Sequence, residues 1–192
     1  MSGIDRPRIE AAVAEILAAI GEDPSRPGLE STPSRVADSY AEFFAGIGRD
    51  AAAELGEPVP LEQGHQADTV LLRDIEFRSV CEHHLLPFLG VAHVAYLPGD
   101  SVIGLGRIPR AIEILASRPQ IQERLTEQIA DTIEQGASAR GVLVVLDAAH
   151  SCVTTRGARQ SGSTTVTVAA RGAYSDPVVR AELIALIGRG VK

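Results

Sequence analysis

Residues 69–97 read TVLLRDIEFRSVCEHHLLPFLGVAHVAYL, and this run sets the class of fold that the rest of the chain must complete. Residues 70–77 and 91–97 are rich in branched and aromatic side chains, which predicts two β-strands. The connection between them contains CEHH at residues 81–84, a dense group of chemically active side chains. The run therefore predicts two consecutive strands with a candidate site where they join.

The residues before this run predict a helical extension. Apolar residues recur at helical spacing over residues 9–20, and a glycine and a proline then end the pattern. Thr32 and Pro33 predict the N-cap and the first residue of a second helix that reaches about residue 45. Residues 46–66 lack clean periodicity and predict a short helix and a loop.

The residues after this run alternate between helices and strands. Pro109 predicts the start of one helix, which breaks at Arg118, and Pro119 predicts the start of another that reaches about residue 135. The second helix carries an apolar stripe that predicts its buried face: Ile121, Leu125, Ile129 and Ile133. Two strands and a closing helix are expected over residues 142–146, 163–170 and 178–187.

The order β-β-α-α-β-β, followed by a helix, predicts an α+β domain over residues 67–192. Residues 1–66 are expected to form an N-terminal helical extension of that domain. At 192 residues, the chain is long enough to bury a substantial core.

Composition limits the classes of partner. The chain is 45% hydrophobic and 22% charged, as is usual for a globular protein, and its net charge of −7 argues against a nucleic-acid-binding surface. The N-terminus lacks the apolar core of a signal peptide, and no apolar run approaches the roughly 18 residues of a membrane helix. We therefore expect a cytoplasmic protein with reduced thiols and no membrane partner.

Both cysteines of the chain lie close to histidines, which predicts a metal site. Thiolate and imidazole are ligands that zinc prefers. The candidate ligands are Cys81, His84 and Cys152, and three protein ligands leave the fourth position of a tetrahedral zinc open to water. This open position is typical of a catalytic site, with His83 and His150 left for proton transfer.

The spacing of the cysteines also allows other interpretations. Cys81 and Cys152 could be two small buried hydrophobic residues, or a disulfide, which a reducing compartment disfavours. A zinc-free redox protein that uses both thiols is a further alternative. A zinc nucleoside deaminase is a poor fit, because the chain has neither His-x-Glu nor Pro-Cys-x-x-Cys.

The motifs of the chain resemble those of the GTP cyclohydrolase I family. The resemblance covers roughly residues 26–186 and rests on RPGL and TPSRVA at 26–37, CEHHLLPF at 81–88, RPQIQERL at 118–125 and HSCVTTRG at 150–157. It implies the tunnelling fold (T-fold), whose β-β-α-α-β-β units associate into barrels. It also implies a homodecamer with active sites at subunit interfaces.

The resemblance implies an activity and a set of catalytic residues. The family converts GTP and water to 7,8-dihydroneopterin triphosphate and formate, the first step of tetrahydrofolate and pterin biosynthesis, beginning with hydrolytic attack at C8 of guanine. Its zinc ligands match Cys81, His84 and Cys152. His150 matches the histidine beside the attacking water, and His83 matches the one that protonates the opening ring.

The resemblance also implies how the substrate is bound. Glu123 corresponds to the carboxylate that anchors the guanine base, and Gln122 is expected to bind substrate beside it. The family's phosphate-binding positions fall on Arg107, Arg110 and Arg156, and guanidinium groups match the geometry of phosphate oxygens.

One segment departs from the family pattern. Residues 104–107 read GLGR, where the family usually has Gly-Leu-Ser-Lys. Our preferred interpretation is that Arg107 still binds the triphosphate and that Gly106 offers a backbone N–H. A specialised paralogue that acts on another purine nucleotide, and a non-catalytic nucleotide-binding relative, are the alternatives.

Overall fold

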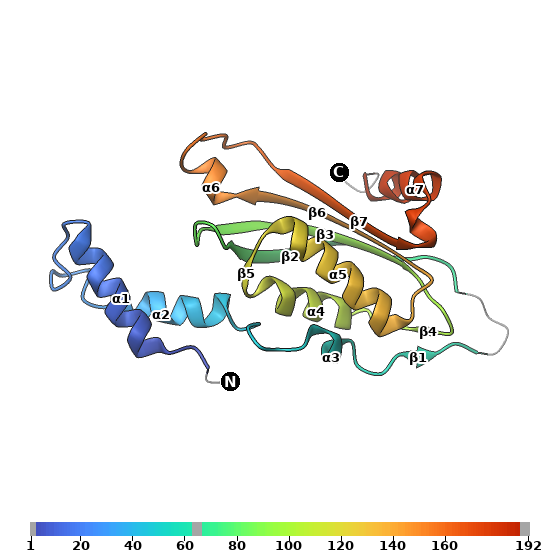
Figure 1. The fold of residues 1–192 in the computed structure, drawn as a ribbon, viewed down its shortest axis with the longest axis horizontal. Coiled ribbons are helices and arrows are strands. Elements are labelled where there is room, and N and C mark those ends of the chain that lie inside the picture. Colours follow the sequence, from blue (N-terminus) through green and yellow to red (C-terminus); the bar gives the residue numbers. More distant parts are fainter. Residues whose placement is uncertain (1–2, 63–66, 189–192) are drawn as a thin grey trace.

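A five-stranded sheet forms the centre of the computed structural model, which describes residues 3–62 and 67–188 (Figure 1). Neighbouring strands follow the order β5-β2-β3-β6-β7. All neighbours are antiparallel except β5, which pairs in parallel with the end of β2. The strands of this sheet are β2 (Val70–Cys81), β3 (Pro87–Leu97), β5 (Pro119–Gln120), β6 (Gly141–His150) and β7 (Thr165–Gly172). A separate small sheet pairs β1 (Val59–Pro60) with β4 (Ser101–Val102).

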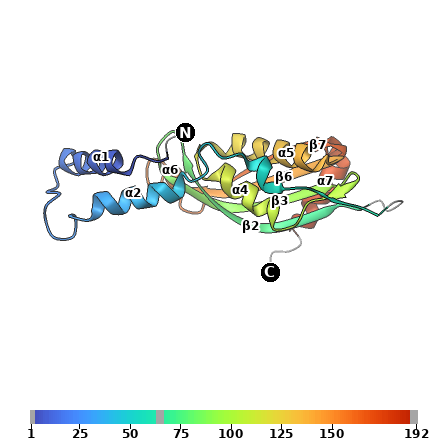
Figure 2. The same cartoon turned by 90° about the horizontal axis from the view of Figure 1, so that it is seen from below.

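Helices cover both faces of the sheet, but unequally. Helices α4 and α5 lie side by side along one face, whereas the C-terminal helix α7 packs on the opposite face (Figures 1 and 2). The helices are α1 (Arg6–Ala19), α2 (Thr32–Phe43), α3 (Ala51–Leu55), α4 (Arg107–Ala116), α5 (Gln122–Ala137), α6 (Ser151–Thr154) and α7 (Pro177–Gly188), with a 3₁₀ turn η1 at Ala173–Ser175. This order confirms the predicted β-β-α-α-β-β arrangement.

Strand β6 shows how alternation builds the two cores. Successive side chains of a strand point to opposite faces. Val144 and Leu146 therefore join the main core beneath α4 and α5, whereas Leu143 and Val145 pack against α7. Because both faces are covered, residues 142–146 of the strand are apolar without interruption, as the sequence predicted.

The predicted stripe of α5 is confirmed for three of its four residues. Leu125, Ile129 and Ile133 are at most 1% exposed and lie in the main core. Ile121 instead occupies the N-cap position, because Pro119 and Gln120 pair with β2 as a short strand and delay the helix. The prediction of a helix from Pro119 is therefore wrong by three residues.

The other predicted boundaries shift for local reasons. Helix α2 begins at Thr32, so Ser31 rather than Thr32 is its N-cap and Pro33 is its second residue. The hydroxyl of Thr32 donates instead to the carbonyl of Gly28 (3.5 Å). Helix α4 begins at Arg107, two residues before Pro109. Strands β2 and β6 both run further than predicted, to Cys81 and His150. Cys81 pairs with Gln120 of β5, and the ladder of β6 with β3 continues to His150.

The N-terminal part has two different environments. Helices α1 and α2 pack on each other and project beyond the sheet, and α1 has no buried residue (Figures 1 and 2). In contrast, Ala51 and Leu55 of α3 belong to the main core. The division of the chain into residues 1–66 and 67–192 stays a prediction, with α3 packed against the later part. Within the described ranges, no helix has the length and apolar character needed to cross a membrane.

Strand β6 approaches β3 so closely at Gly90 that no side chain fits there. A Cβ atom on Gly90 would lie 2.1 Å from the carbonyl oxygen of Asp147 and 2.6 Å from the Cβ of Ala148. We expect Gly90→Ala to destabilise the protein by about 1–3 kcal/mol, the usual cost of overpacking. For a chain of this size, each kcal/mol lowers the thermal midpoint by about 2–4 °C, which thermal unfolding followed by fluorescence would measure.

A glycine in open space provides the control. Gly162 has an ordinary backbone conformation and nothing within 4 Å of its Cβ position. Gly162→Ala is expected to stay within about 0.5 kcal/mol of the wild type. Equal midpoints for both variants would contradict the steric argument.

Candidate metal centre

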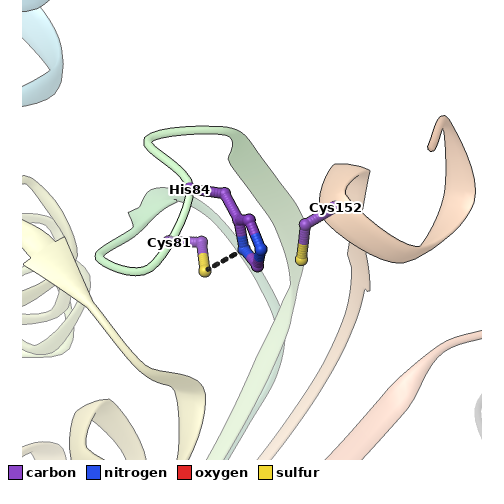
Figure 3. A group of neighbouring side chains, drawn as sticks. All are labelled: Cys81, His84 and Cys152. Carbon is purple, nitrogen blue, oxygen red and sulfur yellow. Dashed lines mark hydrogen bonds between the residues drawn. The ribbon is translucent and has the colours of Figure 1, made fainter. Parts of the chain in front are cut away.

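Three strand ends meet at one edge of the sheet and carry the candidate site. Val80 of β2 pairs with Pro87 of β3, and Phe88 of β3 pairs with His150 of β6. The turn between β2 and β3 and the short helix α6 after β6 therefore face each other (Figure 3). The register of the sheet thus brings together two sequence runs that are about 70 residues apart.

A tight turn places His84 beside Cys81. The carbonyl of Cys81 accepts hydrogen bonds from the N–H groups of His84 (3.3 Å) and Leu85 (2.8 Å), and its N–H donates to Leu86 (2.9 Å). Leu85 adopts a left-handed conformation with φ of 52°, which reverses the chain. As a result, Nδ1 of His84 lies 3.9 Å from Sγ of Cys81.

Cys81, His84 and Cys152 form a group whose ligand atoms all lie within 4.8 Å of one another (Figure 3). In a tetrahedral zinc site with Zn–S near 2.3 Å and Zn–N near 2.0 Å, ligand atoms are about 3.5–3.8 Å apart. Small side-chain movements would therefore close this group around an ion. In the part of the chain that the structure describes, it is the one such group of at least three residues.

The same group meets the requirements of a catalytic site. Cys81 is buried, Cys152 is half-buried and His84 is exposed. The site is therefore enclosed by protein on the side of Cys81 and open to solvent on the side of His84. Three thiolate and imidazole donors leave one tetrahedral position for water. The donor set and its exposure fit zinc in a hydrolytic role.

Without a bound cation, the surroundings of Cys152 disfavour its thiolate form. Burial raises the pKa of the Cys152 thiol, and the nearby thiol of Cys81 raises it further. The charge of Arg156 partly opposes this change. A bound divalent cation stabilises both thiolates, so metal binding and thiol deprotonation are coupled at this site.

The two remaining histidines flank the group in different environments. His83 is exposed, and its Nδ1 lies 3.9 Å from Sγ of Cys81. His150 is half-buried, and Phe88 stacks on its ring with centroids 4.5 Å apart and planes 7° apart. Burial lowers the pKa of His150, and the charge of Glu123 partly opposes that change.

Gln122 and Glu123 begin α5, and the first is buried whereas the second is exposed. Gln122 is 1% exposed, and its Oε1 lies 2.7 Å from Nε2 of His150. Glu123 is exposed and lines a shallow pocket of about 320 Å³ with Arg124 and Val168. The structure therefore brings both residues to the site, but it commits the side chain of Gln122 to protein partners.

An ion pair that the sequence analysis missed links the turn to α5. Arg124 contacts the carboxylate of Glu82, next to Cys81, and its Nε donates to Oε1 of Gln120 (3.0 Å). The pairing with Arg124 lowers the pKa of Glu82. No periodicity in the sequence signals this contact, because its partners are 42 residues apart.

The three arginines expected to bind phosphate lie on two different parts of the chain. Arg156 follows α6 and lies near enough to Cys152 to influence its pKa. Arg107 begins α4 and lies against Gly56, and Arg110 lines surface pockets with Glu113. At about 1.5 Å per helical residue, Arg107 is about 14 Å along α4 from the helix end that adjoins β5.

Comparison with known proteins gives consistent matches over almost the whole chain. A family model described as GTP cyclohydrolase I matches residues 9–188. The GTP cyclohydrolase 1 of Leifsonia xyli subsp. xyli (strain CTCB07) is 78% identical over 190 residues, which cover 99% of this chain and 99% of that protein. The GTP cyclohydrolase 1 of Rhodopirellula baltica (strain DSM 10527 / NCIMB 13988 / SH1) is 52% identical over 187 residues, which cover 97% of this chain and 80% of that protein.

A solved structure also matches part of the chain. The crystal structure of the archaeosine synthase QueF-Like in the apo form covers 56% of this chain and 97% of its own, with a TM-score of 0.48 and 17% identity.

Proposed function

The chain belongs to the GTP cyclohydrolase I family, and we propose that it converts GTP and water to 7,8-dihydroneopterin triphosphate and formate at the site described above. Its sheet domain has the tunnelling fold of that family. The observation that carries the proposal is the Cys–His–Cys group of Cys81, His84 and Cys152, which has the donor set of a catalytic zinc site.

Two histidines of the chain are suited to different proton transfers during ring opening. When bound, zinc supplies Lewis acidity, which activates water as a nucleophile near neutral pH. His150 lies beside the metal ligands and is suited to take a proton from attacking water. His83, on the turn that carries His84, is suited to deliver a proton to the imidazole ring of the base as it opens. The open side of the site admits the substrate.

Glu123 is suited to recognise the base. Its carboxylate is exposed at the first turn of α5, next in sequence to Gln122, whose Oε1 lies 2.7 Å from Nε2 of His150. A carboxylate can accept two hydrogen bonds, which matches the N1–H and the exocyclic amine of guanine. This pairing would favour guanine over adenine.

The phosphate-binding arginines support an assembly with shared sites. Arg156 lies near the metal ligands of its own chain, whereas Arg107 and Arg110 lie exposed on α4. We infer that α4 of another copy supplies the latter two, as expected for a homodecamer with sites at subunit interfaces. A cytoplasmic location, where thiols stay reduced, completes this proposal.

The activity can be tested directly with the zinc-loaded protein. GTP is expected to give formate and a pterin, fluorescent after oxidation, in equal amounts. GDP, GMP and ATP are the comparison substrates, because GLGR at residues 104–107 raises the question of nucleotide choice. No formate from any of the four would contradict the proposed reaction, and loss of triphosphate preference would favour the specialised paralogue.

Removal of the base anchor is expected to weaken substrate binding. Glu123→Ala should raise KM for GTP about 10- to 100-fold, because a hydrogen bond to a charged group contributes about 1.5–3 kcal/mol. Steady-state kinetics of formate release would measure this change. Zinc content should stay the same, because Glu123 lies outside the metal ligands.

Glu127 offers a matched control. It lies one turn further along α5, lines the same shallow pocket and pairs with Arg171. Glu127→Ala removes the same charge from the same helix and is expected to leave KM within about threefold, since a surface ion pair contributes little. Equal KM values for the two variants would contradict the role of Glu123.

A further inference from the structure

The amide of Gln122 has one orientation that satisfies its neighbours. Its Nε2 donates to the carbonyl oxygens of Leu146 (3.2 Å) and Thr165 (2.8 Å) and lies 3.1 Å from the hydroxyl of Thr167. A reversed amide would place its oxygen against two carbonyl oxygens, which are acceptors only. The oxygen Oε1 therefore faces the other way, toward His150.

This orientation determines which nitrogen of His150 carries hydrogen. Oε1 of Gln122 lies 2.7 Å from Nε2 of His150, and an amide oxygen only accepts, so Nε2 is the donor. Phe88 holds the ring from one face. Over residues 3–62 and 67–188, Nδ1 of His150 has no hydrogen-bond partner. The ring is thus fixed by one edge and one face, with Nδ1 free.

The support behind Gln122 is a closed network. Thr126 donates to the backbone carbonyl of Gln122 (2.7 Å), and its hydroxyl pairs with that of Thr167 (2.6 Å). The side chains of Gln122 and Thr126 are each 1% exposed. A buried polar network in which every member is satisfied is rigid, so it can hold His150 in one position.

We propose that Gln122 is a positioning residue that acts on the reaction through His150. It fixes the imidazole in the Nε2–H tautomer and leaves Nδ1 as the nitrogen available to the reacting groups. This inference rests on the proposed function, which gives His150 its role. It replaces the expectation that the Gln122 side chain binds substrate, because every polar atom of that side chain has a protein partner.

The test is a substitution that keeps length and removes polarity. In zinc-loaded Gln122→Met, we expect kcat to fall about 10- to 100-fold, as when the supporting partner of a site histidine is lost. KM for GTP should change less than about threefold, because substrate contacts remain. A raised KM with an unchanged kcat would identify Gln122 as a substrate ligand and overturn the proposal.

Tyr96 is the control for loss of a buried hydrogen-bonding group away from the site. It is 0% exposed, its hydroxyl accepts from the N–H of Ile103 (3.2 Å), and it pairs with Val142 at the opposite end of β3 from the Phe88–His150 pair. Tyr96→Phe is expected to lower stability while lowering kcat by less than about threefold. A kcat loss equal to that of Gln122→Met would reduce the effect to general loosening and overturn the proposal.

A second readout does not depend on activity. The protein is labelled with ¹³C-histidine and measured by NMR at one pH at which the imidazole is neutral. The Cδ2 resonance of His150 is the one that is absent in His150→Ser. We expect it to report the Nε2–H tautomer in the wild type and a mixture of tautomers in Gln122→Met. An Nδ1–H signal in the wild type would overturn the proposal. If the Met variant does not fold, Gln122→Asn keeps a buried amide that is one methylene too short to reach His150, and the same kcat and KM criteria apply.

A double-mutant cycle separates action through His150 from direct action. Adding Gln122→Met to His150→Ser is expected to lower kcat no further, because the group that Gln122 positions is gone. Independent, additive losses would overturn the proposal. Wild-type protein that releases no formate from GTP would contradict the proposed function instead, so the two failures are distinguishable.

Discussion

Cys152→Ala is expected to abolish zinc binding and activity while leaving the chain folded. Cys152 is half-buried at the start of α6, whereas Cys81 is 6% exposed and belongs to the main core. The alanine therefore removes a ligand at small cost to packing. Zinc should fall well below one ion per subunit, and formate release from GTP should fall about 10³-fold or more, because a Lewis acid contributes several kcal/mol to the reaction.

His83→Ala provides the control for this loss of metal. Its imidazole lies on the same turn and as close to Sγ of Cys81 as that of His84, 3.9 Å in both cases. The proposed ligand set nevertheless excludes it, so His83→Ala should keep one zinc per subunit while losing activity. Elemental analysis of both variants, purified under reducing conditions, would measure the difference. One zinc per subunit in Cys152→Ala, or none in His83→Ala, would contradict the assigned ligands.

The elements that could be predicted are those with a long and regular hydrophobic pattern in the sequence. Residues 142–146 are apolar without interruption, and they form the centre of β6, covered on both faces. Strand β5 has no pattern, since Pro119 and Gln120 are too short to show one. It exists because the edge of β2 offers unpaired backbone groups, a property of the assembled sheet.

The metal ligands were predictable because the chain has only two cysteines and each lies near histidines. Chemistry alone selected Cys81, His84 and Cys152, and the structure brings their ligand atoms together. The partners of His150 were not predictable in this way. Its contacts with Gln122 and Phe88 depend on the register of β3 with β6 and on how α5 is rotated.

A clue to the burial of Gln122 was nevertheless present. The buried face of α5 runs back from Ile129 through Leu125 to Gln122, at helical spacing. A helical wheel therefore places one amide side chain at the end of an apolar stripe. The expected start at Pro119 with Ile121 in the stripe obscured this. A buried amide at such a position must be hydrogen-bonded, which directs attention to the strand ends beside it.

His150→Ser is expected to keep zinc and GTP binding but lose ring opening. His150 lies outside the metal-ligand group, so zinc should remain at one ion per subunit. Loss of a positioned acid–base group lowers kcat about 10²- to 10⁴-fold, with KM changed far less. Single-turnover measurement of formate release, together with zinc analysis, would show this separation.

His93→Ser is the control for removing, from a strand of the same sheet, a histidine that has one ring hydrogen bond. His93 lies on β3, is 8% exposed, and accepts a hydrogen bond from the N–H of Asp74 on Nδ1 (3.2 Å). Its loss removes one side-chain hydrogen bond, as the loss of His150 does, so each substitution should lower stability by about 0.5–1.5 kcal/mol for that bond. It should nevertheless leave kcat close to the wild type. Normal turnover in His150→Ser would remove that residue from the mechanism, and loss of zinc in it would make His150 a ligand.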